Sequence, residues 1–317
     1  MTSNSEYDVI IIGGGAAGLS AAVTLTRARR RTLVVDAGSP RNAPAAHAHN
    51  YLGLEGIPPF ELLDKGRREA QSYGAEIRDG SVVSIDGSIG QFTVELSDGS
   101  TTSARRLLLA TGLTDELPDI PGVAERWGKE VLHCPFCHGW EVRGDTVGIM
   151  GSSFGVHQAL MWRQWSDRVV LFTEGFEPTD EEYEKLAARN IGVVTDRVAG
   201  LAVANDALVG IELVSGKTVE IQAVVVKPHF AANAALLEKL GLAVTDVMMG
   251  EHAMGSAVAA DPMGATSIPG VFAAGNVVGI TENLIGSAAA GVRAGGAVNG
   301  SLIEEDVDIA VRARRAS

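Results

Sequence analysis

A glycine-rich turn between two apolar runs, near the start of this 317-residue chain, most constrains its fold. Four β-branched residues, Val9–Ile12, predict a buried parallel strand. The turn Gly13-Gly14-Gly15-Ala16-Ala17-Gly18 follows, and an alanine-rich segment then predicts a helix from Leu19 to about Arg29. A second strand is predicted from Thr32 to Val35 and ends in Asp36. This strand–turn–helix–strand order is typical of a dinucleotide-binding Rossmann unit.

Each residue type in this turn has a task in dinucleotide binding. Gly13 makes the tight turn, Gly15 lets the backbone approach a pyrophosphate, and Gly18 lets helix and strand pack closely. The pyrophosphate is expected at the helix N-terminus, where N–H groups and the helix dipole favour negative charge. Asp36 lies about 20 residues further on, where a carboxylate binds a ribose hydroxyl.

Composition bounds the remaining possibilities. Hydrophobic residues at 46% and 38 glycines indicate an α/β protein with a large core, and the length suits two domains. No apolar run reaches the roughly 18 residues needed to span a bilayer. The first residues lack the basic segment and cleavage site of a secretory signal, so a cytoplasmic location is expected. A net charge of −13 argues against a nucleic-acid partner.

The chain has only two cysteines, Cys134 and Cys137, and they form one CxxC. A disulfide scaffold needs more cysteines, and a structural zinc needs four ligands that this pair alone does not supply. No metal site is therefore predicted. A redox-active dithiol/disulfide couple is the interpretation that remains.

Four further segments carry a resemblance to a known family. They are Asn50–Gly53, Leu107–Gly112, His133–Glu141 and Ile268–Asn276. Together with the first turn they resemble low-molecular-weight thioredoxin reductases over nearly the whole chain. The resemblance implies two Rossmann-like domains of the two-dinucleotide-binding flavoprotein type, FAD as cofactor, and a homodimer. The family has an aspartate where this chain has Asn276, whose amide still has hydrogen-bonding groups for a ribityl hydroxyl.

The resemblance also implies which residues bind FAD: Gly13, Gly15, Ala16, Ala17, Gly18, Asp36, Ala37, Arg41, His49, Asn50, Val83, Ala110, Thr111, Gly112, Gly275, Asn276, Asn283 and Leu284. An alanine-glycine segment from Gly286 to Ala297 predicts a helix. Its N-terminal dipole would stabilise anionic reduced flavin.

The expected FAD domain is built from two pieces, residues 1–118 and 247–317. Residues 119–246 form the domain that carries the CxxC. Linkers are predicted at Pro118–Pro121 and Thr245–Gly250. The polar N-terminus and the basic tail Arg312–Arg315 are expected to fray.

The residues around the cysteines narrow the resemblance. The stretch from Cys134 to Glu141, Cys-Pro-Phe-Cys-His-Gly-Trp-Glu, resembles the dithiol oxidases that close disulfides in gliotoxin- and holomycin-type natural products. His138, which replaces the reductases' aspartate, can take a thiol proton near neutral pH. A structural hydrogen bond is the alternative for this histidine, and His133 can simply end the preceding strand. Phe136, Trp140, Trp162 and Trp165 are either walls for a small substrate or ordinary core.

A second Rossmann unit begins with a strand at Asp145–Met150, a helix at Val156–Trp165 and a strand at Arg168–Phe172. In its turn Ser153 and Val156 replace the second and third glycines, so the backbone cannot approach a pyrophosphate closely. Glu174, at the ribose position, would repel the 2′-phosphate of NADPH. These residues predict a lost nicotinamide site, and a degraded NADH site is the alternative.

The predicted reaction follows from that loss. A substrate thiolate attacks Cys134 and releases Cys137, the second substrate thiol closes a cyclic disulfide, and His138 moves the protons. Electrons then pass through FAD to O2, which yields H2O2. The alternatives are a disulfide reductase fed by NADPH or ferredoxin, and a flavin redox sensor without turnover.

Overall fold

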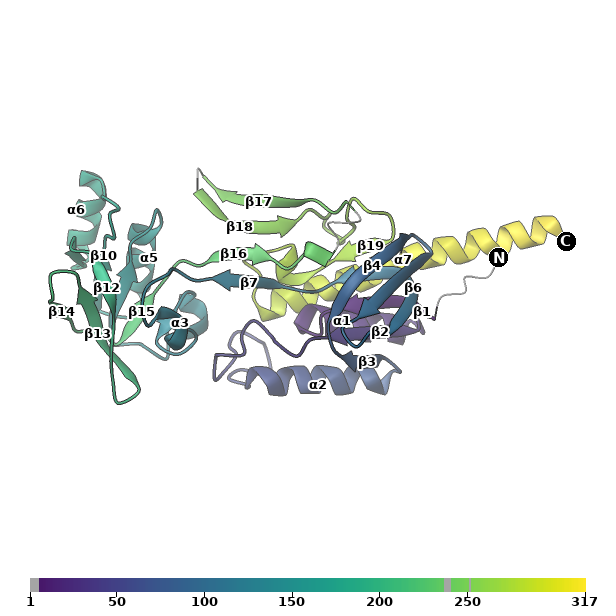
Figure 1. Ribbon diagram of the computed structural model, residues 1–317, viewed down its shortest axis with the longest axis horizontal. Coiled ribbons are helices and arrows are strands. Elements are labelled where there is room, and N and C mark those ends of the chain that lie inside the picture. The colour runs from purple at the N-terminus through teal and green to yellow at the C-terminus, as the bar shows by residue number, and fades with distance from the viewer. Residues whose placement is uncertain (1–5, 237–240, 251) are drawn as a thin grey trace. The chain divides into compact units, whose positions relative to one another are not determined.

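The computed structural model describes residues 6–236, 241–250 and 252–317. The chain divides into two compact units. Unit 1 consists of Met1–Ala43, Tyr51–Thr114 and Phe230–Ser317, and unit 2 consists of Pro44–Asn50 and Asp115–His229. Figure 1 labels the elements of both.

Unit 1 contains a seven-stranded sheet and the longest helix. Its elements are β1 (Tyr7–Ile12), α1 (Ala16–Arg27), β2 (Thr32–Asp36), α2 (Pro59–Ser72), β3 (Glu76–Asp79), β4 (Val82–Ser88), β5 (Gln91–Leu96), β6 (Thr101–Leu109), β17 (Val244–Met249), β18 (His252–Val258), β19 (Val271–Ala273), the 3₁₀ helix η2 (Gly275–Val277) and α7 (Leu284–Ala316).

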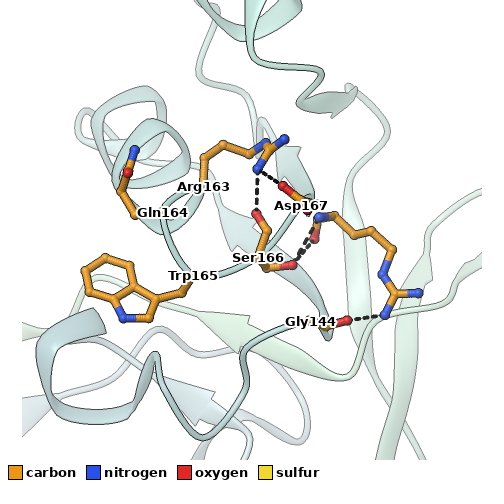
Figure 2. Close-up of a pocket in the computed structure, with 7 residues that line it drawn as sticks. Gly144, Arg163, Gln164, Trp165, Ser166 and Asp167 are labelled. Carbon is orange, nitrogen blue, oxygen red and sulfur yellow. Dashed lines mark hydrogen bonds and ion pairs between the residues drawn. The ribbon is translucent and has the colours of Figure 1, made fainter.

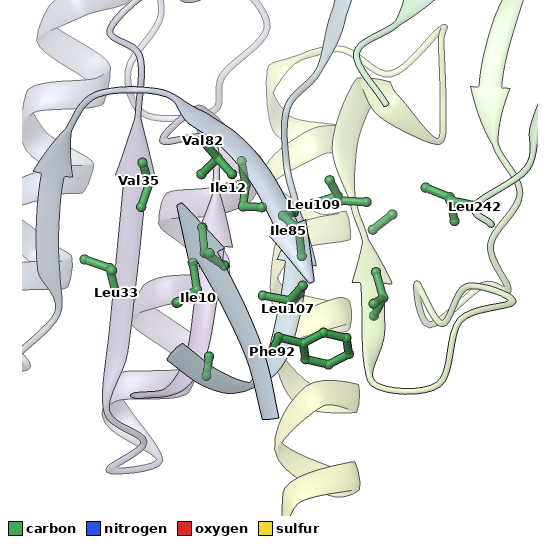
Figure 3. Close-up of a cluster of buried hydrophobic side chains, with 14 of the residues drawn as sticks. Ile10, Ile12, Leu33, Val35, Val82, Ile85, Phe92, Leu107, Leu109 and Leu242 are labelled. Carbon is green, nitrogen blue, oxygen red and sulfur yellow. The ribbon is translucent and has the colours of Figure 1, made fainter. Parts of the chain in front are cut away.

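Five strands of the sheet run parallel in the order β3-β2-β1-β6-β19, and β5 and β4 continue from β6 as an antiparallel pair. Helices α1 and α7 pack together on one face, against Val9, Ile11 and Leu108 (Figure 1). On the other face, Ile10 and Leu107 meet Phe92 and its neighbours from the antiparallel strands (Figure 3). Successive residues of β1 thus serve both faces, as expected for a buried parallel strand.

Unit 2 repeats the Rossmann pattern. Its elements are β8 (Val131–Leu132), α3 (Val123–Arg126), α4 (Pro135–His138), β9 (Thr146–Met150), α5 (Gly155–Trp162), β10 (Arg168–Phe172), α6 (Asp180–Ala188), β11 (Gly192–Val194), β12 (Val198–Ala204), β13 (Ala207–Leu213), β14 (Thr218–Val219) and β15 (Ala223–Val225). The parallel order is β11-β10-β9-β15-β8. One face carries α5 and α6, and the other carries the antiparallel strands β12-β13-β14. The predicted fold of two Rossmann-like units is confirmed.

The segment that returns to unit 1 differs from the sequence prediction. A further sheet has the order β17-β18-β16-β7, where β7 is Leu113–Glu116 and β16 is His229–Ala232. The linker predicted at Thr245–Gly250 is wrong, because β17 (Val244–Met249) occupies all but the last of these residues and pairs with β18. The chain passes into unit 1 at Phe230, earlier than the expected position 247.

The C-terminal tail also differs from expectation. Helix α7 continues to Ala316 and includes the arginines expected to fray. It begins at Leu284, two residues before the predicted Gly286, because Asn283 caps it by accepting a hydrogen bond from the Gly286 N–H. Residues 1–5, the other segment expected to fray, lie outside the described residues. Within the described ranges, no helix combines the length and apolar character that crossing a membrane requires.

Two buried arginines fasten α7 to the sheet. Arg106 on β6 is 2% exposed, and its Nη1 lies 2.7 Å from Glu305 Oε2. Arg105 is 7% exposed, and its Nη2 lies 3.2 Å from the same oxygen of Glu305. Arg105 also pairs with Asp306 at 2.6 Å and with Asp8 at 3.1 Å, whereas Glu305 is the one carboxylate that pairs with Arg106 among the described residues.

We expect Glu305→Gln to lower the free energy of unfolding by about 1–3 kcal/mol, because it leaves the buried Arg106 without a charged acceptor. Glu304→Gln is the matched control, since it makes the same charge change at the adjacent, exposed position of α7. It should change stability by no more than about 0.5 kcal/mol. Urea unfolding followed by circular dichroism measures both, and equal losses would contradict this role of Glu305.

Candidate active site

The first glycine turn has the geometry that a bound pyrophosphate needs. Gly13 has φ +105°, and an ideal Cβ on it would lie 2.3 Å from the Ala110 carbonyl oxygen. A Cβ on Gly18 would lie 1.9 Å from the Gly13 carbonyl oxygen, so α1 crosses β1 at backbone distance. A Cβ on Gly15, in contrast, would meet no atom within 4 Å. Gly15 is the N-cap of α1 and has no side chain to cap it, so the turn leaves room for an anionic group at the helix start.

Asp36 lies at the carboxyl end of β2, beside this turn. Its Oδ1 accepts a hydrogen bond from the Gly14 N–H at 3.1 Å, and its Oδ2 pairs with Arg67 Nη2 at 2.5 Å. Arg67, on α2, also pairs with Asp79 at 2.9 Å. Arg67 was not predicted as a site residue, because its contact with Asp36 depends on the tertiary fold.

The segment after β6 brings further predicted residues to the same edge of the sheet. Ala110 is buried, and Thr111 and Gly112 are partly exposed. Asn233 holds this segment: its Nδ2 donates to the Thr111 carbonyl at 3.1 Å, and its backbone N–H donates to the Gly112 carbonyl at 3.1 Å. Asn233 is another residue that sequence reasoning missed.

Two further predicted cofactor residues of unit 1 contact each other, and two others are exposed. Arg41 Nη1 donates to Asn276 Oδ1 at 3.3 Å, and Gly275 with φ +78° starts η2. Ala37 is exposed, and Val83 is 51% exposed on β4. The cofactor role of these two residues stays a prediction.

The cysteine pair lies at the carboxyl end of β8 in unit 2. Cys134 and Cys137 form a disulfide, with their Cα atoms 5.3 Å apart. Cys134 precedes α4, and its carbonyl accepts hydrogen bonds from the N–H groups of Cys137 and His138. Both cysteine residues are partly exposed.

His138 ends α4, directly after Cys137. Both of its ring nitrogens are shielded from water, and neither has a hydrogen-bond partner among the described residues. Burial lowers the pKa of His138 below its ordinary value, Glu141 opposes this shift, and His49 adds to it. Burial therefore favours the neutral imidazole, which has a nitrogen lone pair that can accept a proton.

His49 and Asn50, predicted to bind cofactor, belong to unit 2, where their contacts are with the cysteine segment. His49 Nε2 lies 3.3 Å from Glu141 Oε1, and Asn50 Nδ2 donates to the Phe136 carbonyl at 2.7 Å. The resemblance did not indicate these contacts. They make the short segment 44–50 part of the surroundings of the disulfide.

The aromatic candidates fall into two groups. Trp162 is fully buried and therefore belongs to the core. Phe136 and Trp140 are 66% and 65% exposed on either side of Cys137. Phe136 meets the edge of Trp165 at 5.3 Å, and Arg143 covers one face of Trp140 at 4.1 Å. Exposed aromatic side chains beside a disulfide form a surface on which a small apolar molecule can rest.

A cavity of about 420 Å³ lies behind this segment, between Gly144 and the turn Arg163–Arg168. Figure 2 shows that its arginines are already bonded, Arg163 to Asp167 and Arg168 to the Gly144 carbonyl. The cysteines do not line it. This cavity therefore does not form part of the redox site.

The second glycine turn is bonded to itself. Ser152 Oγ accepts a hydrogen bond from the Phe154 N–H, and the Ser152 carbonyl accepts one from the Gly155 N–H. Lys227 Nζ lies 4.6 Å from the centre of the Phe154 ring. Glu174, expected at a ribose, instead accepts a hydrogen bond from the Val198 N–H at 2.6 Å. The turn follows β9, Glu174 follows β10 and Lys227 follows β15, so these groups lie at the carboxyl ends of parallel strands, where a dinucleotide binds in such sheets.

Comparisons with known proteins agree with this architecture. Residues 7–295 match the family described as pyridine nucleotide-disulphide oxidoreductase. Thioredoxin reductase tcpT of Claviceps purpurea is 32% identical over 90% of both chains, and thioredoxin reductase sirT of Leptosphaeria maculans is 29% identical over 96% of this chain and 97% of its own. The crystal structure of HlmI superimposes with a TM-score of 0.89 at 45% identity, over 98% of both chains.

The predicted resemblance is thus confirmed across both units. Two Rossmann-like folds, an open glycine turn in the first and a CxxC disulfide in the second occur together in one chain. The chain belongs to the pyridine nucleotide-disulphide oxidoreductase family, as a thioredoxin reductase-like flavoprotein.

Proposed function

We propose that this protein is an FAD-dependent dithiol oxidase, which forms an intramolecular disulfide in a small-molecule dithiol and passes the electrons to O2 to give H2O2. The similarity of the Cys134–Glu141 stretch to gliotoxin- and holomycin-type enzymes supports this substrate class. The observation that carries the direction of electron flow is the second glycine turn, whose N–H groups bond to Ser152. A protein that does not take electrons from a nicotinamide needs another source, and a dithiol supplies them.

The residues of unit 1 fit FAD. The open space at Gly15 and the uncapped start of α1 suit a pyrophosphate, and Asp36 suits a ribose hydroxyl. Ala110–Gly112 and Gly275 lie at the ends of neighbouring strands, β6 and β19. When bound, FAD would supply the two-electron oxidation of the cysteine pair and the transfer of those electrons to O2.

The disulfide reacts by two successive exchanges. A substrate thiolate attacks Sγ of Cys134, which breaks the Cys134–Cys137 bond and releases Cys137 as a thiolate. The second substrate thiol loses its proton and attacks the substrate sulfur of the mixed disulfide. The substrate leaves as a cyclic disulfide, and the protein holds two reduced cysteines. Two electrons have moved from substrate to protein.

His138 handles the protons of these exchanges. A neutral, unpartnered imidazole next to Cys137 can accept a proton from a thiol that must become a thiolate. The protonated ring then stabilises a thiolate by charge. The alternative role for His138 was a structural hydrogen bond. Neither of its ring nitrogens makes a hydrogen bond to any described residue.

The rival functions are a disulfide reductase fed by NADPH or ferredoxin and a redox sensor without turnover. The cytoplasmic location and the homodimer remain predictions.

An aerobic assay of the FAD-loaded protein with small dithiols should consume O2 and release H2O2, whereas anaerobic NADPH should leave the flavin oxidised. Rapid bleaching by NADPH would favour a reductase, and absence of O2 uptake with every dithiol would favour a sensor.

Replacing His138 should slow this reaction. We expect His138→Gln to lower the dithiol-dependent rate by about 10²–10⁴-fold, the range for loss of a general base. His157→Gln is the control, because His157 is exposed on α5. Stopped-flow reduction of the flavin by a dithiol measures both variants. Comparable rates for wild type and His138→Gln would contradict the assigned role.

The same residue makes stability depend on pH. Because its pKa is lower in the folded state, the unfolded chain binds the proton first as the pH falls. Wild type should therefore lose stability relative to His138→Gln between about pH 7 and the lowered pKa. Urea unfolding of both proteins at several pH values measures this, and parallel curves would exclude a buried neutral His138.

Glu141 and His49 should shift the acid limb of the pH–rate profile in opposite directions. Glu141 raises the pKa of His138 and His49 lowers it. Glu141→Gln should therefore move the limb to lower pH, and His49→Gln should move it to higher pH. Dithiol-dependent rates measured between pH 5 and pH 9 test this, and shifts in the same direction would contradict it.

A further inference from the structure

Asn276 occupies the position at which the family has an aspartate, and its side chain makes three hydrogen bonds within unit 1. Nδ2 donates to the Gly279 carbonyl at 3.0 Å and to the Glu282 carbonyl at 2.9 Å. Oδ1 accepts from Arg41 Nη1 at 3.3 Å. The orientation of the amide is unambiguous, because carbonyls only accept hydrogen bonds and guanidinium groups only donate them.

These bonds cannot be made by the family's aspartate. A carboxylate has no N–H to donate, so its oxygen would face two carbonyl oxygens at hydrogen-bond distance. Both carbonyls would lose their donor, and the negative charge would repel them. The turn from Gly279 to Glu282 in this protein is therefore built around an amide.

The turn leads directly into α7. Glu282 precedes Asn283, the N-cap whose Oδ1 accepts a hydrogen bond from the Gly286 N–H at 2.9 Å. The Glu282 side chain lies over two glycines, since a Cβ on Gly279 would lie 2.6 Å from its Cγ and a Cβ on Gly286 1.9 Å from its Oε2. Asn276 thus fixes the start of α7 through the backbone that precedes it.

Arg41 adds an electrostatic consequence. Its guanidinium lies over the Phe230 ring at 5.0 Å from the ring centre and donates to the amide of Asn276. An aspartate here would form an ion pair with this cation and cancel its charge. An asparagine accepts the same hydrogen bond and contributes no negative charge.

We propose that Asn276 is a positioning residue with two effects: it holds the turn before α7, and it keeps the cofactor site one charge more positive than the family's aspartate would. The proposal rests on the FAD site of the proposed function. A more positive site stabilises an anionic reduced flavin, so it favours electron uptake from dithiols. In this chain both amide donors go to backbone carbonyls, and the cofactor contact expected of Asn276 stays a prediction.

Restoring the family residue tests this inference. Asn276→Asp should raise the dissociation constant for FAD about tenfold or more, lower the unfolding temperature of the apoprotein and lower the flavin midpoint potential. Asn299→Asp is the matched control: it makes the same change on α7, and Asn299 Oδ1 also accepts from an arginine, Arg30, at 2.8 Å. Among the described residues, Asn299 donates no side-chain hydrogen bond that an aspartate would lose. All three quantities should stay near the wild-type values in this control.

Three outcomes separate the possibilities. Equal FAD affinity and potential in wild type and Asn276→Asp would overturn the proposal. A lower unfolding temperature with an unchanged potential would retain the turn and refute the electrostatic effect. If Asn276→Asp does not fold, Arg41→Gln removes the charge and keeps the amide, and an unchanged potential there refutes the electrostatic effect. Because affinity, unfolding and potential need no dithiol, an absence of oxidase activity would defeat the proposed function and leave these comparisons valid.

Discussion

The close approach of backbone segments around Gly13 is the constraint on which unit 1 depends. The carbonyl of Gly13 would contact a Cβ on Gly18, and the carbonyl of Ala17 would lie 2.0 Å from a Cβ on Gly291 of α7. At these two points the turn after β1 approaches α1, and α1 approaches α7, with backbone against backbone. This packing brings the start of α1 close to the ends of β6 and β19, so this helix terminus and the turn before α7 belong to one edge of the sheet.

The two units share the strand–turn–helix pattern, but their glycine turns make different hydrogen bonds. In unit 1 the turn leaves space at Gly15 and its carboxylate, Asp36, bonds to the turn itself. In unit 2 a serine hydroxyl satisfies the N–H of Phe154, and the corresponding carboxylate, Glu174, bonds to the backbone of β12. Both Rossmann units keep their cores, because apolar burial depends on the strands and helices and not on the turn. A change of residues in the turn therefore costs little folding stability.

Much of the fold follows from local sequence, since β-branched runs and glycine turns fixed β1, α1, β9 and β10 to within a few residues. The β17 strand was mistaken for a linker, because its exposed residues resemble a loop until β18 pairs with it. The cysteine pair and His138 were also visible in the sequence. The contacts of His49 with Glu141 and of Arg67 with Asp36 were not, because residues far apart in sequence meet only through tertiary packing. The donors of Asn276 likewise needed the structure of the turn.

The distribution of tryptophans has a practical consequence for spectroscopy. The sequence has 4 tryptophans, at positions 127, 140, 162 and 165, and all of them lie in unit 2. Trp165 packs against Phe136 and Gly139, so two of its neighbours belong to the cysteine segment. Trp140 is largely in water, whereas Trp162 is fully buried. Intrinsic tryptophan fluorescence therefore reports on unit 2, which carries the cysteines. The visible absorption of a bound flavin would report on unit 1.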